Sequence, residues 1–132
     1  MIILVALRQH AKPILNKYLF QGIKKLFGGK KEEGQILAPV AGQAVPLSEV
    51  PDPAFAQEIL GKGVAILPSE NEFKAPASGE VTVLFETGHA VSIRTESGAD
   101  VIVHIGLDTV NLKGQFFITH VKQGDTVKAG DL

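Results

Sequence analysis

The sequence predicts a small all-β protein, a sandwich or barrel of antiparallel strands with one short helix. From Ile36 onward, short apolar runs recur, and Gly or Pro breaks them at intervals of about ten residues, which is typical of small all-β domains. The composition agrees, because 132 residues with 45% hydrophobic and 20% charged side chains fit one globular domain rather than a disordered chain.

Each expected element is a short run of β-forming residues bounded by turn residues. In chain order the expected strands are 36–38, 42–46, 63–67, 73–75, 79–84, 90–94, 100–105 and 116–121. Between the second and third strands, Asp52-Pro53 is a helix-opening pair and predicts a short helix over 53–60.

A repeated corner supports this division into strands. The segments Ala38-Pro-Val-Ala-Gly42 and Ala75-Pro-Ala-Ser-Gly79 share an Ala-Pro-x-x-Gly core, and a strand is expected after each one. Proline ends pairing and glycine permits a tight turn, so we interpret the two segments as a structural quasi-repeat.

Residues 1–34 have a different texture and are expected to form a basic amphipathic tail or linker, separate from a domain over 35–132. Apolar residues recur at steps of three and four, Pro13 suits a first helical turn, and Gly28-Gly29 suits its end. A helix over 12–31 lies on an anionic membrane surface, packs on a neighbouring domain, or serves as a linker, and the sequence leaves all three alternatives open.

Charge and cysteine content narrow the setting. Residues 1–31 hold seven basic and no acidic side chains, whereas residues 32–132 hold six basic and fourteen acidic ones. The apolar run 1–7 is too short for a membrane span and lacks the flanks of a signal peptide. With no cysteine in the chain, we expect a cytoplasmic protein, which would lie at the inner membrane face if the tail binds lipid. We expect no nucleic-acid partner.

Two histidines in matching contexts are the candidate chemistry. His89 and His104 each lie at the edge of an apolar run rich in β-formers, so two strands can bring both imidazoles to one point. By residue type alone, the pair fits a nucleophile, a metal site, or a core histidine, because both faces of the strand over 101–105 are apolar.

Several ordered motifs then resemble one known family, the glucose-type enzyme IIA domain of the bacterial phosphoenolpyruvate-dependent sugar phosphotransferase system. The motifs are Ile36-Leu-Ala-Pro-Val-Ala-Gly42, Val50-Pro-Asp-Pro-Ala-Phe55, Gly61-Lys-Gly-Val-Ala-Ile-Leu-Pro68, Thr87-Gly-His-Ala90, Val103-His-Ile-Gly-Leu-Asp-Thr-Val-Asn-Leu-Lys-Gly114 and Val121-Lys-Gln-Gly-Asp-Thr-Val127. The resemblance implies a barrel-sandwich-hybrid-like fold over about 36–132. It also implies that the strands continue past Leu132 and that this chain is short at its C-terminus.

The resemblance further implies a histidine phosphotransferase component. His104 would accept a phosphoryl group from phosphohistidine on the carrier protein HPr and hand it to the IIB domain of a sugar permease. His89 would stand beside the phosphate, the Thr87 hydroxyl would orient His89, and the Gly106 carbonyl would hold the Nδ1 proton of His104. Because the donor is already activated, no cofactor or metal is expected, and the phosphoryl group is carried covalently.

A docking surface is implied around the histidines, since the site must meet two partners in turn. Its apolar ring would comprise Ala54, Phe55, Ile59, Leu60, Phe85, Ile102 and Val110, and Asp52 and Asp108 would form an acidic rim. Phe55 is the member we expect most strongly, although core packing is the alternative for Phe55, Phe85 and Ile102.

Two other classes of protein, a lipoyl- or biotinyl-type carrier and a zinc-binding β-domain, share features with this sequence. A lipoyl- or biotinyl-type carrier uses a turn similar to 121–131, but it needs a modifiable lysine at a hairpin tip, and no lysine here has that setting. A zinc-binding β-domain needs three protein ligands, and only His89, His104 and Asp108 are available. The two histidines alone would hold zinc weakly, with a partner's carboxylate completing the site.

Overall fold

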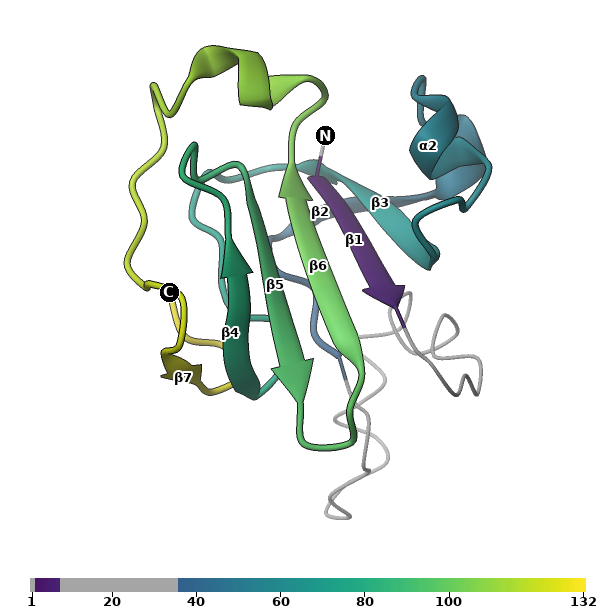
Figure 1. The fold of residues 1–132 in the computed structure, drawn as a ribbon. Coiled ribbons are helices and arrows are strands. Elements are labelled where there is room, and N and C mark those ends of the chain that lie inside the picture. Colours follow the sequence, from purple (N-terminus) through teal and green to yellow (C-terminus); the bar gives the residue numbers. More distant parts are fainter. Residues whose placement is uncertain (1, 8–35) are drawn as a thin grey trace.

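The computed structural model describes the backbone of residues 2–7 and all of residues 36–132, and it confirms an all-β protein of antiparallel strands (Figure 1). All the paired strands run antiparallel, in one seven-stranded sheet of order β2-β3-β1-β6-β5-β4-β7. The strands are β1 (Ile2–Leu7), β2 (Gly42–Pro46), β3 (Lys62–Pro68), β4 (Gly79–Leu84), β5 (Ala90–Thr95), β6 (Asp100–Ile105) and β7 (Thr126–Val127). The helix expected over 12–31 lies outside the described residues.

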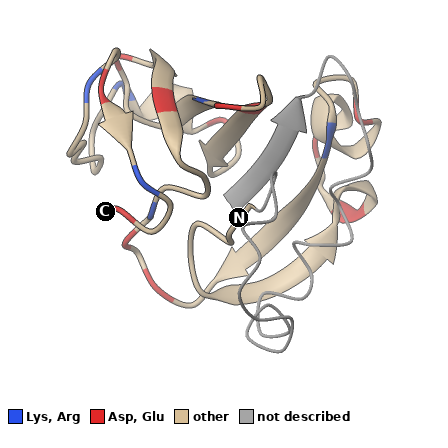
Figure 2. Cartoon of the chain, turned by 90° about the horizontal axis from the view of Figure 1, so that it is seen from below, with Lys and Arg blue, Asp and Glu red and all other residues tan. Residues whose placement is uncertain are grey.

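The sheet curves strongly, so that β2 and β3 turn away from β4 and β5, as Figure 1 and the view from below in Figure 2 show. One face of β3 and β6 buries Val64, Ile66, Val101 and Val103 under the segments that precede β2 and β4. The opposite face buries Ala65 of β3 under the short helices η2 (Leu47–Glu49) and α2 (Pro53–Ala56). Both faces of β6 are therefore covered, which explains its continuous apolar sequence.

The expected bounds of β2, β4 and β6 are confirmed, whereas three other predicted strands are wrong. Residues 36–38 and 73–75 make isolated backbone hydrogen bonds instead of a ladder: Leu37 N–H donates to the Pro76 carbonyl and Lys74 N–H to the Pro39 carbonyl. The two prolines interrupt pairing because they have no N–H. Residues 116–121 are likewise unpaired, and Phe116 adopts a left-handed φ of 72° that breaks an extended run.

The predicted helix over 53–60 is also shorter than expected. Asp52 caps α2 by accepting a 2.9 Å hydrogen bond from the Ala54 N–H, and Pro53 occupies the first turn. The helix ends at Ala56, and Glu58 then takes a left-handed φ of 55° that no helix continues through.

One strand was not expected at all. Residues 2–7, assigned from sequence to the tail, form β1 in the middle of the sheet, with Ile2–Ala6 paired to β3 and Ile2–Leu7 paired to β6. The expected division of the chain at residue 34 therefore leaves out a strand that belongs to the sheet.

The repeated Ala-Pro-x-x-Gly corner performs the same structural task twice. Pro39 and Pro76 are both fully buried, and Gly42 and Gly79 each open a strand. A Cβ at Gly42 would overlap the Leu67 carbonyl oxygen, and a Cβ at Gly79 would overlap the Arg94 carbonyl oxygen. In both places a glycine is needed because the partner strand comes too close for a side chain.

Gly79→Ala is therefore expected to destabilise the fold by about 1–3 kcal/mol, since β4 must move away from the rigid carbonyl on β5. Urea unfolding followed by circular dichroism measures the change in the free energy of unfolding. Glu80→Ala, at the exposed neighbouring position, is the control and should change stability by less than about 0.5 kcal/mol. Equal stability of Gly79→Ala and the unsubstituted chain would contradict the close approach.

Candidate functional site

The sheet brings His89 and His104 together, as the sequence predicts. Ala90, the first residue of β5, pairs with His104 on β6, and Ile105 N–H donates a 2.7 Å hydrogen bond to the His89 carbonyl. The two imidazole rings meet edge to face, with ring centroids 5.0 Å apart and an interplanar angle of 84°. A turn from Phe85 to Gly88 precedes β5 and presents His89, and Gly88 takes the left-handed φ of 71° that the turn requires.

His104 is held between β5 and α2. Its side chain lies on the same face of β6 as Ile102, and the Phe55 ring of α2 packs against it with centroids 5.0 Å apart. Burial lowers the pKa of His104 from its ordinary value of 6.5, and the neighbouring His89 lowers it further. The Gly106 backbone, Asp52 and Asp108 oppose this shift to a lesser extent. The ring is therefore biased toward its neutral, nucleophilic form.

The two nitrogens of His104 are not equivalent. Nδ1 is fully buried and makes no hydrogen bond within the described residues, so the predicted hydrogen bond to the Gly106 carbonyl is not formed. The carbonyl lies near enough to raise the pKa of the ring, but not in the geometry of a full hydrogen bond. Because Nδ1 is buried, it is not accessible to a molecule that approaches from solvent.

The loop after His104 explains where the Gly106 carbonyl is held. Gly106 has a left-handed φ of 81°, and a Cβ there would overlap the Thr109 side chain. The Thr109 hydroxyl in turn donates a hydrogen bond to the Ile105 carbonyl. Thr109 was not singled out from the sequence, although a hydroxyl three residues after the glycine of a tight turn is a signal for such a bond.

His89 is fixed by Thr87, as the family resemblance implies. The Thr87 Oγ1 lies 2.5 Å from Nδ1 of His89, and the Phe85 ring packs against the imidazole with centroids 5.2 Å apart. His89 is only 4% exposed, and burial lowers its pKa from 6.5. When the hydroxyl donates to Nδ1, the ring proton resides on Nε2, which makes that nitrogen a hydrogen-bond donor.

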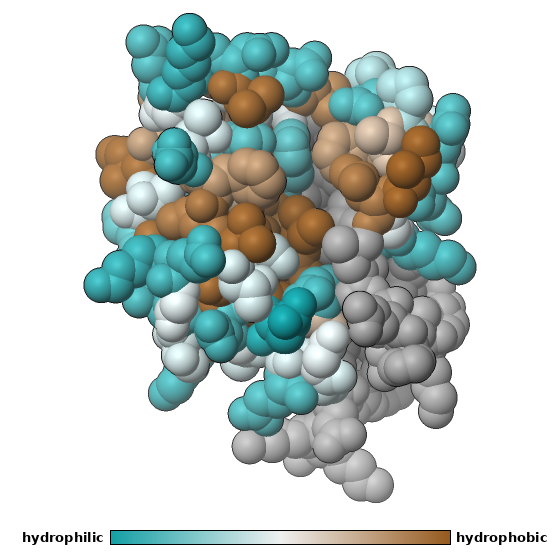
Figure 3. All heavy atoms as spheres, in the orientation of Figure 1, coloured by the Kyte–Doolittle hydropathy of each residue, from teal (hydrophilic) through white to brown (hydrophobic). Residues whose placement is uncertain are grey.

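The residues expected to form a docking ring divide into exposed and buried members. Ile59, Leu60, Phe85 and Val110 are exposed, and Figure 3 shows hydrophobic surface at the α2 end of the molecule. Asp108 is exposed, whereas Asp52, Ala54 and Ile102 are half-buried.

Phe55 does not belong to an exposed ring. It is 6% exposed and packs with Val45, Leu47, Val50 and Ala65. α2 therefore presents this ring to the core, where Phe55 forms one wall of the His104 site.

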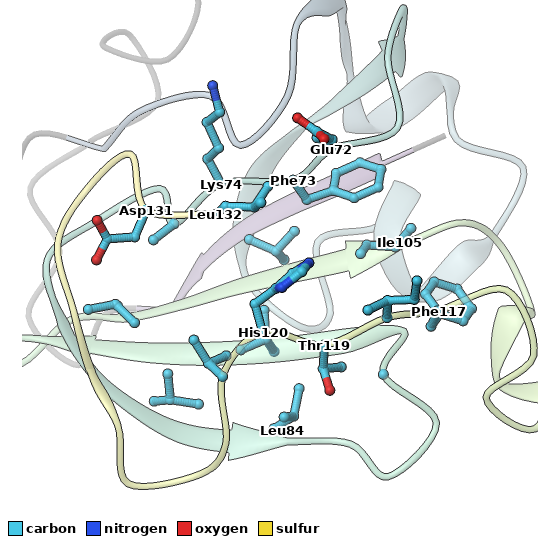
Figure 4. Close-up of a pocket in the computed structure, with 18 of the residues that line it drawn as sticks. Glu72, Phe73, Lys74, Leu84, Ile105, Phe117, Thr119, His120, Asp131 and Leu132 are labelled. Atoms are coloured by element: carbon cyan, nitrogen blue, oxygen red, sulfur yellow. The ribbon is translucent and has the colours of Figure 1, made fainter.

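Among the described residues, neither a metal cluster nor the cavity lined by His120 coincides with the paired imidazoles. Within residues 36–132, no group of three or more His, Cys, Asp or Glu side chains is placed to hold a metal ion. A cavity of about 530 Å³ lies on the other face of β5 and β6, lined by Val91, Val103 and Ile105 and by residues 116–121 (Figure 4). His120 lines this cavity and therefore lies on the face of the sheet opposite His104, because alternate residues of β6 point to opposite faces.

The lowered pKa values predict how stability depends on pH. In the unfolded chain His89 and His104 have the ordinary pKa of 6.5, whereas in the folded chain their pKa values are lower. At a pH between these values, the unfolded chain binds more protons on the two histidines than the folded chain does. The free energy of unfolding should therefore fall as the pH drops below 6.5, and the contribution of the pair should be constant above about pH 7.5. Urea midpoints at several pH values measure it, with the double variant His89→Gln, His104→Gln as control. Identical pH slopes for the two proteins would contradict the lowered values.

Fold and site together define an all-β protein of antiparallel strands with a paired-histidine site. Residues 34–132 match the family described as phosphoenolpyruvate-dependent sugar phosphotransferase system, EIIA 1, and the chain belongs to this family. The resemblance seen in the sequence is thereby confirmed. Members of this family are transferase components of a sugar transport system.

Curated relatives and a solved structure agree with the family. The chain is 46% identical over 113 residues to the PTS system glucose-specific EIIA component of Oceanobacillus iheyensis, covering 86% of this chain and 68% of that protein. It is 47% identical over 117 residues to the protein of the same name from Halalkalibacterium halodurans, covering 82% and 68%. Glucose permease IIA from Mycoplasma capricolum superposes with a TM-score of 0.71 at 47% identity, covering 73% of this chain and 62% of that one. The chain thus spans about two thirds of these proteins' lengths. No helix among the described residues has the length and hydrophobicity to cross a membrane.

Proposed function

We propose that His104 accepts a phosphoryl group from phosphohistidine on the carrier protein HPr and passes it to the IIB domain of a sugar permease. The observation that carries the proposal is the edge-to-face contact of His89 and His104, with the far nitrogen of His89 held by Thr87. A core histidine would have no need of a second, separately oriented imidazole beside it. Family membership supplies the reaction class.

The transfer needs only the side chains present. The lone pair of neutral His104 Nε2 attacks phosphorus while the bond from phosphorus to the donor's histidine nitrogen breaks, and that nitrogen keeps the electron pair. The proton on His104 Nδ1 stays in place throughout, and the Gly106 carbonyl, whose influence already raises the pKa of the ring, accepts a hydrogen bond from this N–H once the ring becomes cationic. No cofactor takes part, since the phosphorus arrives activated.

His89 acts as a hydrogen-bond donor to the transferred group. With Nδ1 engaged by Thr87, its Nε2–H is available to the equatorial phosphoryl oxygens, which carry the negative charge of a loose transition state. Because the donor is already in place, no reorganisation is needed during transfer.

The partner surface surrounds the pair. Exposed Ile59, Leu60, Phe85 and Val110 give an apolar contact of modest area, which suits a complex that must dissociate quickly. The carboxylates of Asp52 and Asp108, which raise the pKa of His104, attract a cationic partner active site.

Both bacterial relatives above are glucose-specific by name, and glucose is accordingly the sugar we assign to the system. The permease, not this chain, would recognise the sugar. The proposed phosphoryl donor, HPr, is a cytoplasmic protein, and we assign the same compartment to this chain.

The test is to incubate the full chain with labelled phosphoenolpyruvate, enzyme I and HPr, and to map the label. The expected product is one acid-labile phosphate on the peptide that contains His104. Omission of HPr is the control and should leave the chain unlabelled. No label, or a label on another residue, would overturn the proposal.

A further inference from the structure

The strand β1 joins what would otherwise be two separate sheets. In the order β2-β3-β1-β6-β5-β4-β7, it is the one described strand that pairs with both the pair β2–β3 and the group from β6 to β7 (Figure 1). Without it, β3 and β6 would each present an unpaired edge in the middle of the fold, which proteins normally avoid. The strand lies outside residues 34–132, the part of the chain that matches the family.

The backbone of His104 itself faces β1. Ile105 N–H donates to the His89 carbonyl on the β5 side, and successive residues of a strand direct their backbone groups to alternate sides. The N–H and C=O of His104 and of Ile102 are therefore directed toward β1, where their partners are Ile3 and Val5. The backbone groups of Val103 and Ile105 are thus directed toward β5, and those of His104 form their hydrogen bonds with β1.

β1 also places the Phe55 wall. The cluster that contains Phe55 is built on Val45 of β2 and Ala65 of β3, and Ile102 of β6 packs against it. In the sheet β1 lies between β3 and β6 and pairs with both, so the spacing of these two strands, and with it the placement of Phe55 against His104, depends on this strand.

We propose that β1 is a positioning strand for the reactive histidine: it bonds the backbone of His104 directly and sets the half-sheet that carries Phe55 against the imidazole. The kinetic consequence rests on the proposed function of His104, whereas the pairing does not. The two are therefore tested by separate measurements.

Hydrogen exchange of the full chain tests the pairing. The amides of Ile102 and His104 should be protected in the unsubstituted protein. Val5→Pro, which removes the N–H facing Ile102, should speed exchange at these two amides about tenfold or more. The amides of Val103 and Ile105 face β5 and serve as internal controls, and Val5→Ile is the matched variant that keeps every backbone bond. Unprotected Ile102 and His104 amides in the unsubstituted chain would overturn the proposal.

Phosphoryl acceptance tests the positioning. Val5→Pro should lower the rate on the order of 100-fold, as expected for a displaced reactive group, and should move the pKa of His104 up toward 6.5 as water reaches the ring. Val5→Ile should leave the rate of phosphoryl acceptance and the pKa of His104 as they are in the unsubstituted chain. Full activity of Val5→Pro with fast exchange at His104 would overturn the positioning role. An unlabelled but normally protected wild-type chain would instead refute only the proposed function.

Because Val5→Pro can unfold the chain, a cross-link gives a second test. The chain has no cysteine, and Ala6 pairs with Val101, so Ala6→Cys with Val101→Cys should oxidise to an intramolecular disulfide in the monomer. Ala6→Cys with Ile93→Cys is the control, because Ile93 lies one strand further away, at about 10 Å, beyond the reach of a disulfide. A disulfide in the control pair, none in the test pair, or one only between two chains would overturn the proposal.

Discussion

Replacement of His104 by Ala is expected to abolish phosphoryl acceptance entirely. The buried Nδ1 leaves Nε2 of this ring as the proposed reacting atom, and the His89 imidazole, 5.0 Å away between ring centroids, is the proposed hydrogen-bond donor beside it. Label from phosphoenolpyruvate, enzyme I and HPr is the measurement, and it should fall to background.

Two controls separate chemistry from folding in this experiment. His120→Ala removes a histidine on the opposite face of β5 and β6 and should be labelled normally. His104→Gln keeps most of the volume that packs against Phe55, so it should fold while remaining unlabelled. Label retained in either His104 variant would show that another residue carries the phosphoryl group.

His89→Gln is expected to be labelled yet to pass the group on about 10²–10³ times more slowly. Glutamine offers an N–H donor, but it cannot reproduce an imidazole whose orientation Thr87 sets through Nδ1. Rapid-quench measurement of transfer from the labelled chain to the IIB domain gives the rate.

Thr87→Val is the matched variant for His89→Gln, since it keeps the shape and removes the hydroxyl that lies 2.5 Å from Nδ1. Its transfer rate should fall between those of the unsubstituted chain and His89→Gln. If His89→Gln transfers at the unsubstituted rate, His89 has no part in the reaction.

Local pattern predicted the strands that lie between clear turn signals, and it failed where pairing is decided at long range. β4 and β6 have the expected bounds because Gly and polar residues delimit their apolar runs. Residues 116–121 are equally rich in β-formers, but no strand among the described residues pairs with them. The apolar run of β1 was assigned to the tail because nothing in a six-residue pattern states which distant strands will flank it.

The site shows the same limit at the level of side chains. The matching contexts of the two histidines predicted that His89 and His104 meet, the family resemblance added Thr87, and the structure brings all three together. Whether Phe55 is exposed or buried depends on how α2 packs against β2 and β3, and Asp52-Pro53 marks only where the helix begins. The Gly106 carbonyl does not form the full hydrogen bond to His104 Nδ1 that the resemblance implies, and the geometry of this turn could not be predicted from the sequence.

The cavity behind β5 and β6 has a consequence for engineering. Val91 and Val103 point into about 530 Å³ of space, while the neighbouring residues on the same strands carry or flank the paired imidazoles on the opposite face. Larger side chains at these two positions would fill space from the rear of the sheet and leave the reactive face unaltered. A more heat-resistant variant can thus be sought by substitutions at positions directly next in sequence to those that form the paired-histidine site.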